Sequence, residues 1–289
     1  MKRVLQGILV ASLALAAFAS QGAPAASVEG VIMPAWVERG ALRTPLAPGM
    51  ALRAGDEIRT GAGSRIYVKL AEGSLVKLGE NASLRILHIA PERRGVFKAA
   101  MNVLEGAFRF TTAALAATRR REIDFTIRTV TAGVRGTDLW GKSLAERQIV
   151  CLIEGRVEVA SSGETPITMN QPLQFYVRER GVAQPVSFVS PEQLKTWAAE
   201  TEIAPGRGAA RRGGKWQVTL ARAAARAAVA PVYDALRGAG YAAQVRALKR
   251  GEKREYRVRI AGLPTRADAE ALAARLRGQF GISDAQVSR

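Results

Sequence analysis

The C-terminal part of the chain contains two stretches that decide its fold, WQVTL at residues 216–220 and YRVRI at residues 256–260. Apolar and polar side chains alternate in both stretches, which is the pattern of a β-strand with one buried face. Each stretch leads into an alanine-rich segment and then toward a further strand. This near-repeat predicts a β-α-β-β-α-β domain over residues 215–289, with both helices on one side of a small sheet.

The second helix of this domain has clear start and stop signals. Thr265 stands at the cap position and Asp268 at the capping-box position. Apolar residues keep helical spacing up to Phe280, and Gly281 is a typical residue to end a helix. The resulting order of elements is that of ferredoxin-like and RNP-like α+β folds.

Strand alternation assigns the side chains of the two stretches to opposite faces of the sheet. The apolar positions are expected to face the helices: Trp216, Val218, Leu220, Tyr256, Val258 and Ile260. The face without helices then receives Gln217, Thr219, Glu255, Arg257 and Arg259. Hydrogen-bonding and cationic groups on such a face indicate a binding surface for something flat or extended, and an ordinary solvated face is the alternative.

Residues 27–189 are expected to be β-structure almost throughout. Short alternating apolar runs, such as Ile66, Val68 and Leu70, recur between glycine-containing turns such as Glu154-Gly155. Many short strands with close turns predict an all-β domain, either a sandwich or a rolled sheet. The chain is therefore expected to be multidomain.

Two further segments separate the predicted domains. Ser190, Pro191 and Glu192 combine a capping hydroxyl, a proline and an acid, and they predict a helix over residues 190–200. Residues 201–214 are rich in glycine and arginine, which is typical of a flexible basic linker.

The N-terminus has the features of a cleavable signal peptide over residues 1–25. Lys2 and Arg3 precede an apolar run that is too short for a stable membrane span, and small residues follow at Ala17 and Ala19. We therefore expect a periplasmic, wall-associated protein with no transmembrane segment after cleavage. The formal charge of +18 suits an anionic partner, although an arginine-rich composition alone also explains it.

The C-terminal domain resembles a known family through motifs that occur in order along the segment. These motifs are Trp216-x-Val218-x-Leu220, Leu236-x-x-x-Gly240-Tyr241 and Tyr256-Arg257-Val258-Arg259-Ile260. With them, residues 215–289 resemble the SPOR family of peptidoglycan-binding domains. The resemblance implies binding of glycan strands stripped of their stem peptides. By position, it maps open-face binding residues onto Thr219, Arg222, Glu255 and Arg257, with Thr219 where a glutamine is usual.

The β-rich part carries a second set of motifs, Leu52-x-x-Gly55-Asp56 and the string AGVRGTD at residues 132–138. It resembles the FecR-type periplasmic domain over roughly residues 28–160. Signalling members of that family place a transmembrane helix before this domain, so direct control of a sigma factor is not expected here. The string is interpreted as a structural motif of five residues: Gly133, Arg135, Gly136, Thr137 and Asp138.

Within this string, Gly136 is expected at a bulge or a close backbone approach. Arg135 and Asp138 are expected to form a charge-assisted pair that fixes the turn.

Catalysis has little support in the sequence. His88 is the only histidine, so there are no clustered imidazoles for a metal site, and no phosphate-binding glycine loop precedes a helix. Cys151 is the only cysteine, which excludes an intrachain disulfide, and its apolar setting predicts a buried thiol. We expect a non-enzymatic protein with no catalytic residues, no metal and no cofactor.

The leading hypothesis is a binding protein for peptidoglycan glycan strands, with the β-rich domain as a ligand- or protein-interaction module. Arg257 and Arg259 would donate to acetamido or lactyl oxygens, and a free muramic carboxylate would favour a cationic face. The alternative is a FecR-like signalling or scaffold protein that uses the SPOR-like domain only for localisation, for example in cell division. A nucleic-acid binder is disfavoured, because export separates the protein from nucleic acid and the aromatic residues are expected under the helices.

Overall fold

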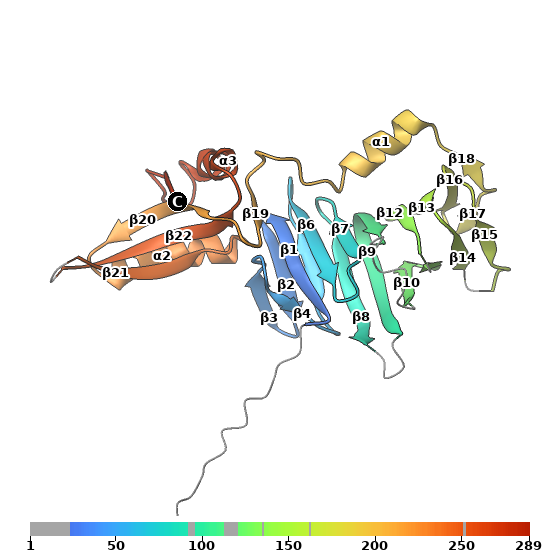
Figure 1. The fold of residues 1–289 in the computed structure, drawn as a ribbon, viewed down its shortest axis with the longest axis horizontal. Helices are drawn as coiled ribbons and strands as arrows, with labels where there is room; N and C mark the ends of the chain where they lie inside the picture. The colour runs from blue at the N-terminus through green and yellow to red at the C-terminus, as the bar shows by residue number, and fades with distance from the viewer. Residues whose placement is uncertain (1–23, 92–95, 113–120, 135, 162, 251–252) are drawn as a thin grey trace, which may run out of the picture.

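The computed structural model describes residues 24–91, 96–112, 121–134, 136–161, 163–250 and 253–289. A large β-rich domain and a smaller C-terminal domain lie end to end along the long axis of the molecule (Figure 1). The expected multidomain, mostly β architecture is confirmed, and the C-terminal region contains helices as expected.

The β-rich domain is built from two sheet layers that share one long strand, β9 (Phe97–Thr111). The first layer also contains β1 (Ala26–Ile32), β4 (Ala51–Leu52), β6 (Arg65–Leu70), β7 (Leu75–Leu78), β12 (Asp138–Ser143), β13 (Arg147–Glu154), β16 (Gln174–Glu179), β17 (Val182–Ala183), β18 (Ser187–Phe188) and β19 (Ala209–Arg211). The second layer also contains β2 (Ala35–Arg39), β3 (Leu42–Pro45), β5 (Glu57–Thr60), β8 (Ser83–Pro91), β10 (Arg121–Ile127), β11 (Val130–Val134), β14 (Val157–Ser161) and β15 (Ile167–Met169).

The strand β9 belongs to both layers because its two halves have different partners. Its first half pairs with β8 and β10, and its second half pairs with β7 and β12. Buried aromatic rings fill the space between the layers, where Phe125 lies 5.1 Å from Phe108 and 5.3 Å from Phe110, centroid to centroid. Alternation along these strands therefore buries one face of each layer, as the sequence pattern predicts.

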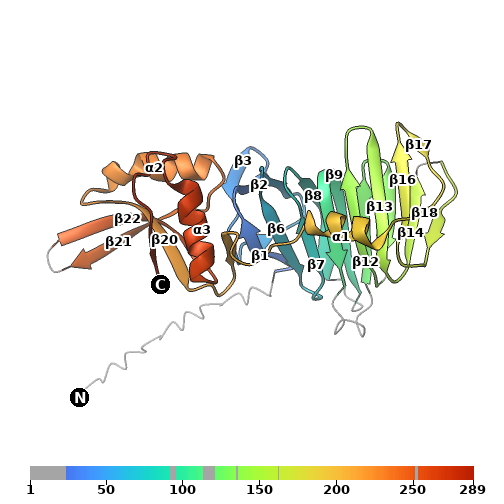
Figure 2. The same cartoon turned by 90° about the horizontal axis from the view of Figure 1, so that it is seen from above.

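The helix α1 (Pro191–Ala199) begins where the sequence predicts it, after the capping residue Ser190, whose side chain accepts a hydrogen bond from the Gln193 amide. Its Trp197 ring stacks on Trp140 of β12 at 4.8 Å with an interplanar angle of 8°. From α1 the chain returns along the outside of the first layer toward β1 (Figure 2).

The segment expected as a flexible linker, residues 201–214, is in fact attached to the β-rich domain, and that expectation was wrong for its central part. Residues 209–211 form strand β19, which pairs with residues 30–32 of β1. Ala209 and Ala210 are almost fully buried there. Two small apolar residues in a glycine- and arginine-rich segment suffice to complete a sheet edge, which composition does not reveal.

Glu202 is the main polar anchor of this connecting segment (residues 201–214). Its carboxylate accepts hydrogen bonds from Lys77 Nζ at 2.5 Å and Tyr67 Oη at 2.6 Å, and Arg109 Nη1 lies 3.1 Å away. The Tyr67 oxygen in turn accepts from the Ile203 amide at 2.8 Å. Burial alone would raise the pKa of Glu202, but the bonds from Lys77 and Tyr67 and the charge of Arg109 hold it below its ordinary value.

The substitution Glu202→Gln is expected to lower the free energy of unfolding at neutral pH. The free energy of unfolding of the variant is also expected to change less than that of wild type as the pH falls. The pKa of Glu202 is lower in the folded chain than in the unfolded chain. Its contribution is therefore present above the ordinary pKa of 4.5 and is lost as the pH falls through the folded value. Urea unfolding at neutral and acidic pH measures this effect.

Glu200→Gln is the matched control, because among the described residues Glu200 forms one ion pair, to Lys142 at 2.7 Å. If the free energy of unfolding fell by the same amount on acidification in wild type and in Glu202→Gln, Glu202 would not be an electrostatic anchor.

The C-terminal domain contains β20 (Trp216–Ala223), α2 (Arg226–Gly238), β21 (Gln244–Arg250), β22 (Lys253–Leu263), α3 (Arg266–Leu276) and β23 (Gln286–Ser288). The sheet order is β21-β22-β20-β23, and both helices pack on β20 and β22. Thr265 caps α3 by accepting from the Asp268 amide at 3.0 Å. The helix ends at Leu276 and not near Phe280 as expected, because Gly278 and Phe280 both adopt positive φ.

The two domains meet at the β1–β2 end of the β-rich domain. The Ala35 amide donates to the Gly240 carbonyl at 3.1 Å, and Arg275 Nη1 donates to the Met33 carbonyl at 3.0 Å. The Trp36 ring lies directly against Gly240. Buried apolar side chains of both domains belong to one continuous cluster. The domains are therefore packed against each other as well as joined by the chain.

Candidate functional site

The C-terminal sheet has one face without helices, and strand register identifies its side chains. Arg257 of β22 lies opposite Arg222 of β20 and Arg246 of β21, while Arg259 lies opposite Thr219 and Gln244. Residues two apart on a strand share a face, and cross-strand partners do so as well. This open face comprises Gln217, Thr219, Arg222, Gln244, Arg246, Leu248, Glu255, Arg257, Arg259, Gln286 and Ser288.

A β-bulge in β20 brings Arg222 onto this face. Thr219 pairs with Arg259 and Ala221 pairs with Val258, so Leu220 is an extra residue without a partner in the β22 register. Strict alternation from Thr219 would turn Arg222 toward the helices. Because the bulge shifts the alternation by one residue, Leu220 stays buried and Arg222 is exposed on the open face.

Three arginines form a line across the sheet, one on each of three adjacent strands: Arg222, Arg257 and Arg246. We call this line the arginine row. Arg222 and Arg246 are exposed, and Arg257 is partly buried beside Glu255, whose hydrogen bond raises the pKa of the guanidinium. Burial, and secondly the charge of Arg246, lowers the pKa of the neighbouring Arg259. Positive charge is therefore concentrated on this part of the face.

The neighbouring part of the open face is polar and contains one further guanidinium, that of Arg259. Arg259 donates to the Gln217 side-chain oxygen, and Gln217 donates to the Arg289 carbonyl at 3.3 Å. Thr219 has an exposed fraction of only 7%, although its register places it on this face. It lies on a central strand between Arg259 and Gln286, whose side chains are much longer. Thr219 therefore offers little surface to a ligand.

The structure brings together all six residues expected on this face, and it adds others that the sequence reasoning missed. Gln244, Arg246 and Leu248 come from β21 and Gln286 from β23. The alternation Gln244-x-Arg246-x-Leu248 was available as a signal, but the bounds of this strand were not predicted. Leu248 has an exposed fraction of 40% and is an apolar element of the face.

The large aromatic residues of the strands lie on the opposite side, as alternation predicts. Tyr256 is paired with Ala223 and Ala247, and both Tyr256 and Trp216 pack against the buried core. In the described part of the domain, the open face thus lacks the aromatic rings on which unpaired bases stack.

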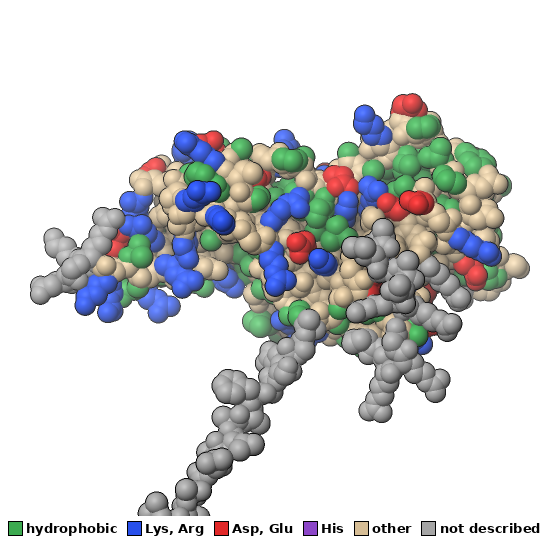
Figure 3. Space-filling view, in the orientation of Figure 1, with side chains coloured by type: hydrophobic (Ala, Val, Ile, Leu, Met, Phe, Trp, Pro, Cys, Tyr) green, Lys and Arg blue, Asp and Glu red, His purple; other side chains and the backbone are tan. Residues whose placement is uncertain are grey.

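The formal charge of the chain is concentrated in this domain. Residues 212–289 contain sixteen Lys and Arg against six Asp and Glu. In the space-filling view, Lys and Arg side chains gather on the C-terminal domain (Figure 3). An anionic ligand is therefore electrostatically favoured here over the β-rich domain.

The described residues of the string at 132–138 make polar contacts within the β-rich domain. Asp138 accepts from Arg109 Nε at 2.9 Å and from Arg109 Nη2 at 2.7 Å, so its bidentate partner is an arginine of β9. Arg135, the partner expected from the sequence, lies outside the described residues. Thr137 is buried, and its hydroxyl donates to the Arg156 carbonyl at 2.6 Å.

The expected close backbone approach at Gly136 is observed. An added Cβ on Gly155 would lie 2.4 Å from the Gly136 carbonyl oxygen, so the two turns are in direct contact.

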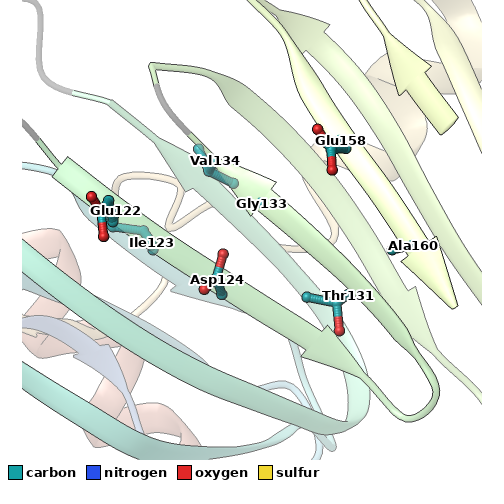
Figure 4. A pocket seen from close by; sticks show the side chains of 8 residues that line it. All are labelled: Glu122, Ile123, Asp124, Thr131, Gly133, Val134, Glu158 and Ala160. Atoms are coloured by element: carbon teal, nitrogen blue, oxygen red, sulfur yellow. The ribbon is translucent and has the colours of Figure 1, made fainter. Parts of the chain in front are cut away.

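A shallow groove of about 240 Å³ lies on the second layer of the β-rich domain. The carboxylates of Glu122, Asp124 and Glu158 surround it, and Gly133 forms its floor between the last two (Figure 4). Glu122 also forms an ion pair with Lys98 at 3.0 Å. Over the described residues, no group of His, Cys, Asp or Glu side chains is arranged to hold a metal ion.

Cys151 is fully buried in β13, and burial raises the pKa of its thiol to about 12. At neutral pH this thiol is protonated and shielded from solvent, which argues against a nucleophilic role.

Comparison with protein families identifies two regions. The family described as FecR protein matches residues 56–158, and the SPOR domain matches residues 212–288. Both resemblances seen in the sequence are thereby confirmed, in the expected order. Among curated proteins, none matches the chain. The described part of the chain has no helix that is long and apolar enough to span a membrane.

Two crystal structures of a candidate anti-sigma factor from Parabacteroides distasonis ATCC 8503 are similar to the chain. The first is 18% identical, covers 49% of this chain and 64% of that chain, and has a TM-score of 0.41. The second is 14% identical, covers 68% of this chain and 96% of that chain, and has a TM-score of 0.39. The chain thus spans less than two thirds of the first of these structures.

Proposed function

Because the chain carries a FecR domain followed by a SPOR domain, we propose that it is an exported envelope protein that binds peptidoglycan through its C-terminal domain. The ligand is the glycan strand, in the form stripped of stem peptides. The observation that carries this proposal is the helix-free sheet face, whose outward side chains are polar and cationic. The protein acts by binding, without catalysis.

The chemistry of the face suits an extended glycan. Gln217, Gln244 and Gln286 supply amide groups that donate to and accept from hydroxyl and acetamido groups. Leu248 supplies apolar surface for the faces of sugar rings. A flat sheet has no deep pocket, so the ligand lies across it and makes many weak contacts.

The β-rich domain has no role in this contact and is proposed to be a ligand- or protein-interaction module of the envelope. The groove bounded by Glu122, Asp124 and Glu158 shows that its surface differs in charge from the C-terminal domain. This difference favours a second candidate function, in which a signalling or scaffold protein uses the SPOR domain for localisation only. Imaging of a fluorescent fusion with an inactivated open face separates the two functions, because only the second predicts activity that survives when the protein is mislocalised.

The substitution Arg257→Glu is expected to weaken binding to amidase-treated sacculi by about tenfold or more, because it replaces a charge-assisted donor by a like charge beside Glu255. Co-sedimentation of the chain lacking residues 1–23 with sacculi measures this. A point substitution is preferable to deletion of the C-terminal domain, because deletion would expose Met33 and Trp36 at the junction.

Arg226→Glu is the control, since Arg226 is exposed at the start of α2 and lies away from the open face. Equal sedimentation of Arg257→Glu and Arg226→Glu with the sacculi would count against the open face as the binding surface. Equal sedimentation of wild type with treated and untreated sacculi would count against the preference for stripped strands.

A further inference from the structure

The hairpin of β21 and β22 extends beyond the rest of the C-terminal sheet. The strand β20 pairs with β22 only as far as Tyr256, whereas β21 and β22 continue to pair up to Arg250 and Lys253. We call this two-stranded extension, residues 248–250 and 253–255, the hairpin arm. Its length is roughly 10 Å. It points away from the β-rich domain, at the end of the long axis of the molecule (Figure 1 and Figure 2).

The charges of the hairpin arm are placed unfavourably for an isolated surface. Lys249 lies opposite Arg254, and the next cross-strand pair is Arg250 and Lys253. Like charges directly opposite each other destabilise a strand pair, and a two-stranded ribbon without a core is itself marginally stable. Lys249 and Arg254 are exposed, and neither forms an ion pair with any described residue. An anionic partner would relieve this repulsion and stabilise the arm.

The base of the hairpin arm adds apolar surface on the same side as Lys249 and Arg254. Residues two apart on a strand share a face, and Ala247 and Tyr256 are cross-strand partners on this side. Ala247 is exposed, and Tyr256 is half-buried with its ring against the core of the domain. This side of the hairpin therefore combines exposed cations with an amphipathic ring, which is the composition of segments that lie on anionic membranes.

From this arrangement we propose that the hairpin arm binds the surface of an anionic phospholipid membrane through Lys249 and Arg254. The phosphate groups of the lipid headgroups neutralise the paired cations, and Tyr256 and Ala247 contact the interfacial region. This side of the hairpin is the one opposite the open face, so membrane contact leaves the open face available to glycan. An exported chain would in this way connect the wall to a membrane.

Flotation with lipid vesicles tests this contact. The chain lacking residues 1–23 is expected to bind vesicles that contain phosphatidylglycerol about tenfold more tightly than vesicles of phosphatidylcholine alone, and salt is expected to reduce the difference. The double variant Lys249→Glu/Arg254→Glu is expected to bind the phosphatidylglycerol vesicles about tenfold or more weakly than wild type, because two cations that favour binding become anions. Circular dichroism confirms that the variant is folded.

The matched control is Lys215→Glu/Arg277→Glu, which changes the net charge by the same amount at two exposed positions. Lys215 precedes β20 at the end of the strand that is distant from the hairpin arm, and Arg277 follows α3, whose Arg275 contacts the Met33 carbonyl of the β-rich domain. This control is expected to keep most of the wild-type affinity for phosphatidylglycerol vesicles.

Two results would overturn the inference. The first is equal binding of wild type to the two kinds of vesicle. The second is an equal loss of vesicle binding in Lys249→Glu/Arg254→Glu and in the control, because the attraction would then arise from the charge of the whole chain. If Lys249→Glu/Arg254→Glu in that case also lost binding to amidase-treated sacculi, the hairpin arm would be assigned to the glycan contact instead.

Discussion

Replacement of Gly155 by alanine is expected to lower the free energy of unfolding of the β-rich domain by about 3 kcal/mol. Gly155 has a φ of +91°, a conformation that costs any residue with a Cβ. The new Cβ would also lie 2.4 Å from the Gly136 carbonyl oxygen and 3.1 Å from the Thr137 Cα. Both are backbone atoms, so neither can move away without displacing the turn. Denaturant unfolding followed by circular dichroism measures the loss.

Gly181→Ala isolates the conformational part of this cost. Gly181 has a φ of +79°, but its added Cβ would have no atom within 4 Å. Its substitution is expected to cost about 1 kcal/mol. If the two variants were equally stable, the contact between the turns at Gly136 and Gly155 would not be tight. The comparison therefore tests the structural interpretation of the string at residues 132–138 directly.

Replacement of Gly240 by alanine is expected to loosen the junction between the two domains. Gly240 has a φ of +88°, and its added Cβ would lie 2.5 Å from the Trp36 ring. The junction is expected to lose about 2 kcal/mol or more, because strain and steric overlap act together. Opening the junction exposes the adjacent strand β19, which contains Arg211. Trypsin cleavage there is expected to accelerate by about tenfold or more.

Gly238→Ala is the control for this prediction, since an added Cβ at Gly238 would have no neighbour within 4 Å. It is expected to leave the cleavage rate unchanged. Small-angle scattering supplies an independent measurement, because separated domains have a larger radius of gyration. Resistance of Gly240→Ala to trypsin, at the level of wild type, would contradict a tightly packed junction.

Alternation in the sequence was sufficient to predict which faces of the C-terminal strands are buried. Val218, Val258 and Ile260 are buried as expected, and Arg257 and Arg259 are on the open face. The bulge at Leu220 could not be predicted, because a register shift depends on the partner strand as well as on the strand itself. The burial of Thr219 was missed for a similar reason, since it depends on longer side chains from neighbouring strands.

Partners distant in sequence were the main features that the sequence could not reveal. Asp138 was expected to pair with Arg135, which lies outside the described residues, and its observed partner is Arg109, 29 positions away in a strand that becomes its neighbour only in the folded sheet. Likewise, Glu202 looked like part of a linker, and its role depends on contacts to Lys77 and Tyr67. The local sequence pattern predicts helices and strands, whereas these side-chain pairs depend on which strands become neighbours in the folded sheet.

The pairing of β19 with β1 has a consequence for how the protein reaches its native state. The strand β1 is the first of its layer to be synthesised, and residues 30–32 on one of its edges remain open until residues 209–211 are available. Closing so long a loop is slow, and an unpaired edge can meanwhile recruit another chain. A nascent or truncated chain that ends before Ala209 would therefore be prone to self-association, because the edge of β1 at residues 30–32 would stay unpaired.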